Sequence, residues 1–228
     1  MVLKTFIKQY TGSSFPALIE TGSGTRYVLK MRGAGNGALS LLSEFVANKV
    51  ASKLKWPVPD VEWVDIPNNF PWVFGTDEFD DIVQRSYGWN LAIEYIPYAI
   101  QADLHSIETA PQNFLNKIYT LDLFFMNVDR TETSGNLLID DLGKIWIIDH
   151  GSLGLFQSTN TTGKELFSNH IFRRMLQTKD LAYDYTLSDN ILFSEVIELI
   201  PDSIISESGF TKESLHKRIA DRMKHLSE

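Results

Sequence analysis

The sequence predicts an α+β protein with two lobes, in which a mostly antiparallel β lobe precedes a helical lobe. Three observations favour this class. Strand patterns mark residues 4–31, 61–65 and 91–97, with one helical pattern at residues 39–54. Helical patterns dominate the second half of the chain, and a hairpin pattern over residues 137–148 interrupts them. We therefore expect the β lobe to cover residues 1–97 and the helical lobe to cover residues 98–228.

The composition of the chain argues against several classes of function. The chain has 228 residues, of which 43% are hydrophobic and 22% are charged, as in ordinary globular proteins. A formal net charge of −8 argues against non-specific nucleic-acid binding and adhesion to anionic membranes, because both need a basic surface. The absence of cysteine excludes disulfides, a thiol nucleophile and a cysteine-based zinc site. No apolar run approaches a membrane span and the N-terminus lacks the apolar core of a signal peptide, so we expect a cytoplasmic protein.

Three strands are expected at the start of the chain, at Thr5–Tyr10, Ala17–Glu20 and Arg26–Met31. The loop Thr11–Pro16 between the first two is rich in small residues, which can offer backbone N–H groups and hydroxyls to phosphate oxygens. A plain hairpin turn explains this loop equally well. In the third strand Val28 and Lys30 share one face, because side chains alternate along a strand. A lysine on this face favours an anionic partner, and the alternative is a side chain that reaches solvent at the sheet edge.

A helix is expected at residues 39–54, because apolar residues recur there at helical spacing. Glu44 lies near the edge of the apolar stripe, where a solvated carboxylate is as good an interpretation as a paired one. The glycine-rich linker Arg32–Ala38 before this helix is not a P-loop, because no Gly-Lys-Ser/Thr follows it. Pro57 and Pro59 end the helical segment.

Further elements follow in order. Strands are expected at Val61–Asp65 and Leu91–Pro97, and the loop-rich stretch between them has room for a strand at Trp72–Gly75. Helices are expected at residues 111–126, 164–176, 189–200 and 211–226. Asp122 is an unusual residue on the first of these helices, where it either braces the loop that follows or faces water.

The hairpin brings polar side chains together. Its strands are Leu137–Ile139 and Ile145–Ile148, joined by a turn in which Gly143 can take a positive φ. If Ile139 lies near Ile145, antiparallel pairing places Asn136 near Asp149, and Asp129 lies on the loop that enters the first strand. Three oxygen-bearing side chains then converge, which suits a hard cation such as Mg²⁺. Taken singly, each residue is explained as a turn or strand-end residue.

The motif Asn127-x-Asp129-Arg130, followed by Asn136-Leu-Leu and by Ile148-Asp149-His150-Gly151, resembles the HipA-like kinases. It is more remotely similar to the type II phosphatidylinositol 4-kinases. In ordinary protein kinases the spacing between the first Asp and the Asn is shorter, and the second Asp precedes Phe-Gly. The resemblance covers most of residues 1–155. It implies a two-lobed protein-kinase-like fold with ATP and Mg²⁺ bound between the lobes.

The resemblance also implies roles for individual residues. Lys30 is expected to hold the ATP phosphates and Glu44 to hold Lys30, while Asn136 and Asp149 bind Mg²⁺ and Asp129 orients or deprotonates the acceptor hydroxyl. Nucleotide contacts are expected from Gly12, Ser13, Ser14, Val28, Glu94, Tyr95, Ile96 and Leu138, with backbone groups at residues 94–96 reading the adenine edge. The linker Arg32–Ala38 is a further candidate for phosphate contact.

The expected activity is transfer of the γ-phosphoryl group of ATP to a hydroxyl, most simply a Ser or Thr of a protein, because the HipA-like family includes toxins that phosphorylate proteins. An antitoxin-like regulatory partner is a further expectation from the resemblance. Two alternatives are a small-molecule or lipid kinase and a nucleotide-binding pseudokinase that acts through a partner. We also hypothesise that autophosphorylation at Ser13 or Ser14 inhibits the protein, because phosphate there would repel bound ATP.

Overall fold

The structure is a computed structural model, and it describes residues 1, 3–12, 14–70, 76–131, 133–157, 168–173 and 179–227. The side chains of residues 77 and 104 are outside this description. So are Ser13, the predicted strand Trp72–Gly75 and most of the predicted helix at residues 164–176.

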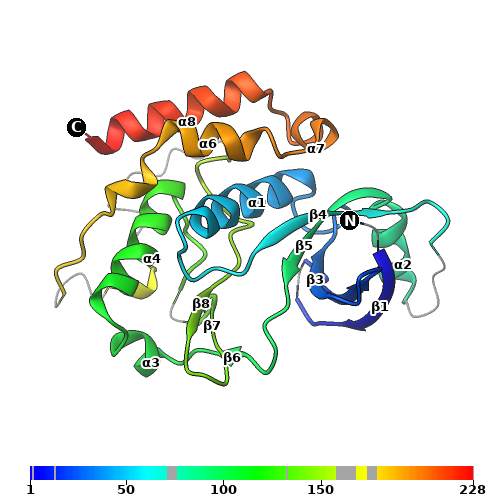
Figure 1. Cartoon of the computed structure of the whole chain (residues 1–228), viewed down its shortest axis with the longest axis horizontal. Coiled ribbons are helices and arrows are strands. Elements are labelled where there is room, and N and C mark those ends of the chain that lie inside the picture. Colours follow the sequence, from blue (N-terminus) through cyan, green and yellow to red (C-terminus); the bar gives the residue numbers. More distant parts are fainter. Residues whose placement is uncertain are drawn as a thin grey trace.

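Within the described residues, five strands form an antiparallel sheet in the order β1-β2-β3-β5-β4. The strands are β1 (Leu3–Gln9), β2 (Ala17–Thr21), β3 (Arg26–Lys30), β4 (Val61–Ile66) and β5 (Gly88–Glu94). The curvature of this sheet is visible in Figure 1. The predicted antiparallel β lobe is confirmed, although β5 begins at Gly88 instead of Leu91 because Trp89 and Asn90 also pair with β4.

The two faces of β3 have different surroundings, as the alternation in the sequence predicts. Leu29 is fully buried in an apolar cluster that includes Ile19 and Met31. Val28 and Lys30 lie on the opposite face and line a pocket. The strand therefore carries core residues on one side and candidate ligand-binding residues on the other.

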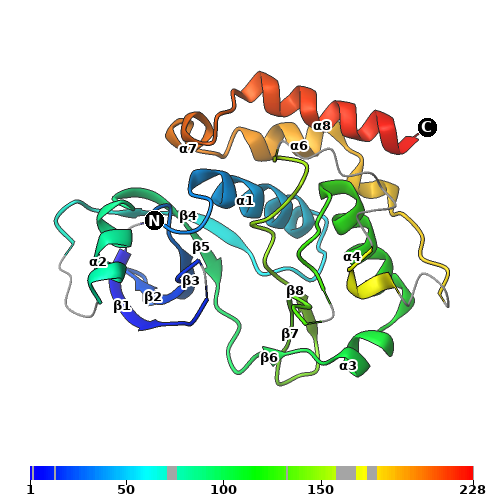
Figure 2. The same ribbon diagram turned by 180° about the vertical axis from the view of Figure 1, so that it is seen from behind.

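Helix α1 (Ala38–Lys53) is the central helix of the molecule. It contacts β4 and β5 on one side, and α6 (Asn190–Ile197) and α7 (Asp202–Glu207) on another. Figures 1 and 2 both place it between the curved sheet and the C-terminal helices. Because it is enclosed by both lobes, most of its residues are buried, and Glu44 is among them. The interpretation of Glu44 as a solvated carboxylate is therefore wrong.

Three short helices were not expected from the sequence. Helix α2 (Asp77–Gln84) lies in the stretch interpreted as loop-rich, and the Thr76 hydroxyl caps it by accepting a hydrogen bond from the Phe79 N–H. Its apolar residues pack under the sheet. Helix α3 (Leu104–Glu108) is capped by Asp103. Helix α7 begins after its cap residue Pro201, a short segment beyond the end of α6.

The helical lobe contains α4 (Gln112–Phe125), α6 and α8 (Lys212–Ser227), whose buried apolar residues share one core with α1. Helix α8 also supports the end of α4 through hydrogen bonds. The Arg222 guanidinium donates to the carbonyls of Leu123 and Phe124, with a distance of 2.9 Å for Phe124. Arg218 donates to the carbonyl of Leu155 at 3.0 Å. The two Arg222 bonds satisfy carbonyls that the end of α4 leaves without intrahelical partners.

A smaller antiparallel sheet lies between the lobes in the described part of the chain. It consists of β6 (Ile100–Gln101), β7 (Leu137–Ile139) and β8 (Ile145–Ile147). Ile139 pairs with Ile145, which confirms the predicted register of the hairpin. Strand β6 is an addition that the sequence did not predict. It anchors the hairpin to the segment that leaves the larger sheet.

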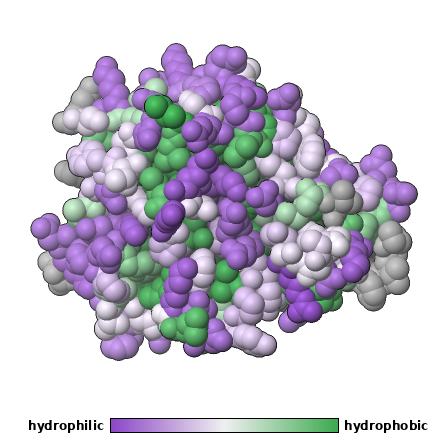
Figure 3. All heavy atoms as spheres, in the orientation of Figure 1, coloured by the Kyte–Doolittle hydropathy of each residue, from purple (hydrophilic) through white to green (hydrophobic). Residues whose placement is uncertain are grey.

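The surface shown in Figure 3 is mostly polar, with apolar patches scattered between charged residues. Such scattered apolar residues are ordinary on a protein surface. Among the described helices, none combines the length and apolar character needed to cross a membrane.

Candidate active site

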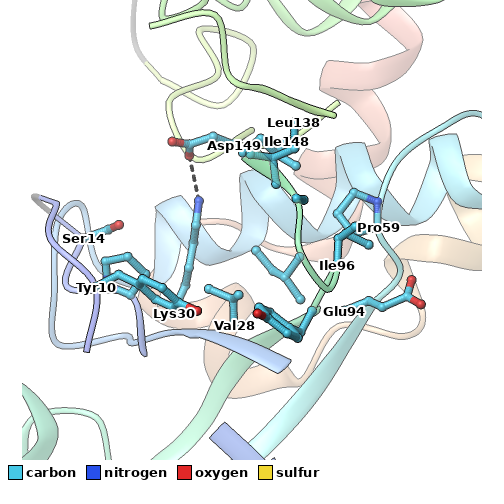
Figure 4. A pocket seen from close by; sticks show the side chains of 14 residues that line it. Tyr10, Ser14, Val28, Lys30, Pro59, Glu94, Ile96, Leu138, Ile148 and Asp149 are labelled. Carbon is cyan, nitrogen blue, oxygen red and sulfur yellow. Dashed lines mark hydrogen bonds and ion pairs between the residues drawn. The ribbon is translucent and has the colours of Figure 1, made fainter. Parts of the chain in front are cut away.

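A pocket of about 310 Å³ lies between β3, the segment after β5 and the β7–β8 hairpin. It is lined by Tyr10, Ser14, Pro16, Val28, Lys30, Pro59, Ile93, Glu94, Tyr95, Ile96, Ala99, Leu138, Ile148 and Asp149. Figure 4 shows Val28 on one side, with Leu138 and Ile148 opposite. Most of the expected nucleotide contacts are thus brought to one place. Gly12 is absent from the described lining, and Ser13 lies outside the described residues.

Lys30 forms two ion pairs in the wall of this pocket. Its Nζ atom lies 2.6 Å from Glu44 Oε2 and 2.7 Å from Asp149 Oδ1. Burial alone would lower the pKa of Lys30, but Glu44, followed by Asp149, raises it above its ordinary value. The amine is therefore charged. Asn48 donates to the other carboxylate oxygen of Glu44 at 3.1 Å, which fixes the orientation of this partner.

The turn after Asp149 packs tightly against α1. A Cβ atom at Gly151 would lie 2.5 Å from Ser40 Oγ, closer than such contacts occur. A larger residue at this position would displace the Ser40 hydroxyl, because the turn lies directly against α1 and beside Glu44, the partner of Lys30.

Asn136 and Asp149 lie side by side at the open end of the hairpin, as the register predicts. The Ile148 N–H donates to the Asn136 carbonyl at 3.0 Å. Both residues have positive φ angles, 48° for Asn136 and 62° for Asp149. Residues other than glycine seldom adopt this conformation, and where they do it is often at functional sites. The Asp149 side chain is 45% exposed, so it remains open to a ligand in the pocket.

Asp129 occupies the loop between α4 and the hairpin, and its side chain is exposed. Its N–H donates to Asn127 Oδ1 at 3.0 Å, and its carbonyl accepts from Asn136 Nδ2 at 3.4 Å. These contacts join the Asp129 backbone, rather than its carboxylate, to Asn136. The loop therefore contacts Asn136 through the Asp129 backbone, and the Asp129 carboxylate is exposed. Convergence of the three side-chain oxygens stays a prediction.

A divalent cation fits the donor set of Asn136 and Asp149. Both offer oxygen atoms, which Mg²⁺ prefers, and Mg²⁺ is usually held by one or two carboxylates together with substrate phosphates. No group of three or more His, Asp or Glu side chains in the described residues forms a metal site by itself. A cation here would need further ligands from a bound phosphate compound.

The loop between β1 and β2 turns sharply beside the pocket. Gly12 has a φ of 147°, a conformation that favours glycine, and its carbonyl accepts from the Phe15 N–H at 3.1 Å. The Tyr10 N–H donates to the Pro16 carbonyl at 2.8 Å. Ser14 is thereby held at the rim, on the same side as Lys30 (Figure 4).

The segment after β5 offers its backbone to the pocket. No described residue accepts a hydrogen bond from the Ile96 N–H, whereas the Glu94 N–H donates to the Asp60 carbonyl at 2.8 Å. The Glu94 carboxylate points outward and accepts from the Asp60 N–H at 3.2 Å (Figure 4). An apolar slot with a backbone donor at its edge can recognise the rim of a purine ring.

The linker Arg32–Ala38 takes no part in the described pocket. The Arg32 N–H donates to Asn90 Oδ1 at 2.8 Å, and the Gly33 N–H donates to Ser86 Oγ at 2.8 Å. A Cβ atom at Gly33 would lie 2.3 Å from the Ile82 carbonyl oxygen. Gly33 therefore serves close packing against α2, and the predicted contact of this linker with phosphate is not supported.

Asp122 is fully buried and organises the loop that carries Asp129. It accepts from Asn127 Nδ2 at 2.8 Å and from Arg130 Nε at 2.7 Å, and it lies 3.0 Å from His170 Nε2. Burial alone would raise the pKa of Asp122, but Arg130, followed by His170, holds it well below its ordinary value. Of the two interpretations from the sequence, the brace is correct and exposure to water is wrong.

Sequence reasoning missed six described lining residues, namely Tyr10, Pro16, Pro59, Ile93, Ala99 and Ile148. Two of them had a usable signal. Ile93 pairs with Val28 across β3 and β5, and Ile148 directly precedes Asp149. The others lie in irregular loop segments, where no periodicity marks the side chains that face a pocket.

Solved structures with a similar fold include the proinflammatory kinase CtkA of Helicobacter pylori. It is 14% identical, with a TM-score of 0.59 over 96% of this chain and 92% of that one. The Rio2 kinase of Chaetomium thermophilum, solved as an ADP/Mg²⁺-phosphoaspartate complex, is 13% identical, with a TM-score of 0.43 over 98% of this chain and 72% of that one. The likeness to CtkA shows a two-lobed kinase fold.

No curated protein matches the chain. The family model described as HipA-like kinase matches residues 3–206, well beyond the first 155 residues over which the motifs suggested a resemblance. With this match over most of its length, and with a kinase fold around the Lys30 pocket, the chain belongs to the HipA-like kinase family.

Proposed function

We propose that this kinase uses ATP and Mg²⁺ and transfers the γ-phosphoryl group to a Ser or Thr hydroxyl of a protein. The main support is the contact of Lys30 with both Glu44 and Asp149, at an apolar pocket that Lys30 and Asp149 line from opposite sides. A buried lysine held between two carboxylates is poised to meet phosphate oxygens. The apolar walls and the pocket volume of about 310 Å³ suit the base of a nucleotide.

In this proposal the adenine lies between Val28 and Leu138, which face each other across the pocket. The Ile96 N–H donates to the ring edge, and the Glu94 and Tyr95 backbone completes that side of the slot. Backbone recognition explains why the Glu94 side chain can point elsewhere. The lobes of residues 1–97 and 98–228 then each supply one side of the nucleotide site.

The phosphates lie toward Lys30, with Ser14 and the turn at Gly12 covering them. Mg²⁺, when bound, would neutralise part of the phosphate charge. Asn136 and Asp149 would hold the Mg²⁺ ion. Phosphoryl transfer depends mainly on positioning and on neutralising charge. In this proposal the exposed carboxylate of Asp129 receives the proton of an acceptor hydroxyl that arrives from solvent.

The proposed phosphate acceptor, a protein hydroxyl, rests on the family and on the net charge of the chain. A net charge of −8 does not favour anionic lipid headgroups or small phosphorylated substrates, which leaves a protein hydroxyl as the better candidate. An antitoxin-like regulatory partner stays a prediction. A pseudokinase that only binds nucleotide would retain the pocket and lack turnover.

The test is transfer of labelled phosphate from ATP in the presence and absence of Mg²⁺. The comparison is between wild type, Asp149→Asn and Asp141→Asn, a control at an exposed turn position of the same hairpin. We expect Mg²⁺-dependent transfer in wild type and the control, and none in folded Asp149→Asn, because the metal loses its anionic ligand. Nucleotide binding without any transfer in wild type would support the pseudokinase instead.

A further inference from the structure

Asn136 is held in an unusual backbone conformation by its neighbours. Its φ of 48° lies in the left-handed region, and the residue is only 8% exposed. Such a conformation persists when surrounding contacts determine it. One of these contacts is the hairpin bond from the Ile148 N–H to the Asn136 carbonyl.

A second contact comes from Arg130, whose side chain is fully buried. Its Nη1 donates to the carbonyl of Gly135 at 3.0 Å and to that of Asn136 at 2.7 Å. A single guanidinium group therefore donates hydrogen bonds to two successive carbonyls at the end of the loop. These hydrogen bonds fix the direction of both carbonyls, because the donors of a guanidinium lie in one plane.

Asp122 balances the buried charge of Arg130 and fixes its orientation. Two hydrogen bonds join them, from Nε to Oδ2 at 2.7 Å and from Nη2 to Oδ1 at 3.2 Å. The same carboxylate accepts from Asn127, whose Oδ1 accepts from the Asp129 N–H. Asp122 thus ties the start of the loop, near Asp129, to its end at Asn136.

Ser134 acts on the amide group of Asn136. The Ser134 hydroxyl donates to Asn136 Oδ1 at 3.0 Å, while Asn136 Nδ2 donates to the Asp129 carbonyl at 3.4 Å. A donor on one side and an acceptor on the other select one of the two orientations of the amide. A carbonyl oxygen has two lone pairs, so Oδ1 can keep the serine and also bind a cation.

We propose that Asp122, Arg130 and Ser134 are positioning residues that hold Asn136 in the orientation needed to bind a metal. Asp122 and Arg130 hold the backbone, and Ser134 holds the amide oxygen. This inference rests on the proposed function, in which Asn136 is a metal ligand. It adds three residues that touch neither the nucleotide nor the metal but set how well the metal is bound.

The experiment measures nucleotide binding by calorimetry, with a non-hydrolysable ATP analogue, once with Mg²⁺ and once with a chelator. The variants are Arg130→Lys, which keeps the charge but loses the paired donors, and Ser134→Ala at an exposed position. Ser134→Thr should restore the hydroxyl. The control is Thr133→Ala, an exposed hydroxyl next in the chain that bonds Thr131 instead of Asn136.

We expect affinity without metal to stay within about twofold of wild type in every variant. The gain in affinity that Mg²⁺ provides should fall by roughly 10- to 100-fold in Arg130→Lys and by about 10-fold in Ser134→Ala, the usual effect of removing groups that orient metal ligands. Ser134→Thr and Thr133→Ala should behave as wild type. If Arg130→Lys does not fold, the exposed Ser134 variants decide the question.

Two results would overturn the inference in different ways. If Mg²⁺ raises the affinity of Arg130→Lys and of Ser134→Ala for the nucleotide as much as that of wild type, Asn136 needs no such support. If these variants lose equal nucleotide affinity with and without Mg²⁺, Arg130 and Ser134 have a purely structural role. A wild-type protein with no Mg²⁺-dependent gain at all would instead overturn the proposed function, so the two failures are distinguishable.

Discussion

Lys30 Nζ and Asp149 Oδ1 lie 2.7 Å apart, although 119 positions separate the two residues in the chain. One belongs to the β lobe and the other to the hairpin of the helical lobe. The ion pair places charged groups from both lobes at one point. Glu44, from α1, completes this arrangement as the second partner of the lysine.

Replacement of Lys30 by Ala should weaken the binding of ATP far more than that of adenosine. Only the phosphates lose a charged partner, and a hydrogen bond to a charged group is worth about 1.5–3 kcal/mol, or roughly 10- to 100-fold in affinity. Calorimetry with both ligands measures the ratio. Lys4→Ala is the control, because Lys4 is exposed and pairs with Glu20 far from the pocket. Equal losses for ATP and adenosine would place Lys30 away from the phosphates.

Asp129→Ala should bind Mg-ATP normally and lose roughly 10²- to 10⁴-fold in the rate of phosphate transfer, the usual contribution of a positioned acid–base group. The carboxylate is exposed and makes no contact that holds the loop, so the fold should be unchanged. Binding and turnover are measured on the same sample. Loss of binding together with activity would identify Asp129 as a ligand or structural residue.

Asp122→Asn should lower the free energy of unfolding by about 3–5 kcal/mol at pH 7, because the buried Arg130 loses its compensating charge. The folded-state pKa of Asp122 lies below its unfolded value of 3.8, so its contribution is complete above that pH. The difference between wild type and variant should therefore narrow as the pH falls below about 4. Chemical denaturation from pH 7 to pH 3 tests this, with Asp141→Asn as an exposed control. A difference that stays constant throughout would contradict the assignment.

Gly33→Ala should destabilise the protein by about 1–3 kcal/mol, the usual cost of forcing atoms into a packed site. The added Cβ would lie 2.3 Å from the Ile82 carbonyl oxygen, which is backbone and cannot move aside easily. Gly22→Ala is the matched control, because nothing lies within 4 Å of a Cβ there. Thermal unfolding of the two variants is the measurement, and equal melting temperatures would argue against the packing of this linker on α2.

Ser14 should become phosphorylated during incubation with Mg-ATP, and the modified protein should bind ATP less tightly. The serine lines the pocket near Lys30, and a phosphate there adds about −1.5 to −2 charge beside the nucleotide phosphates. Peptide mapping by mass spectrometry compares wild type with inactive Asp149→Asn. Ser13 is mapped in the same experiment. The absence of phosphate at both serines in active protein would end this hypothesis.

The strands and the hairpin could be predicted because their patterns are strict. Alternation alone assigns Val28 and Lys30 to one face of β3. In the hairpin, the turn at Gly143, whose φ is 79°, fixes a pairing that carries Asn136 to Asp149. Both inferences need only local sequence and the geometry of extended chains.

Other features depend on contacts between distant segments. The eight residues of α2 give too short a pattern to separate a helix from a loop. The burial of Asp122 follows from Arg130 and His170, which approach it only after the chain has folded back. Tyr10 and Pro59 reach the pocket from irregular loop segments, in which no periodicity indicates where a side chain points.

The match to the family ends at residue 206, whereas α8 begins at Lys212. Arg218 and Arg222 on this helix nevertheless hold the end of α4, from which the Asp129 loop departs, and the chain after Gly151. A protein shortened to the family boundary would keep every described residue of the pocket while losing these supports. The span of the family match is thus shorter than the packed unit that holds the Asp129 loop in place.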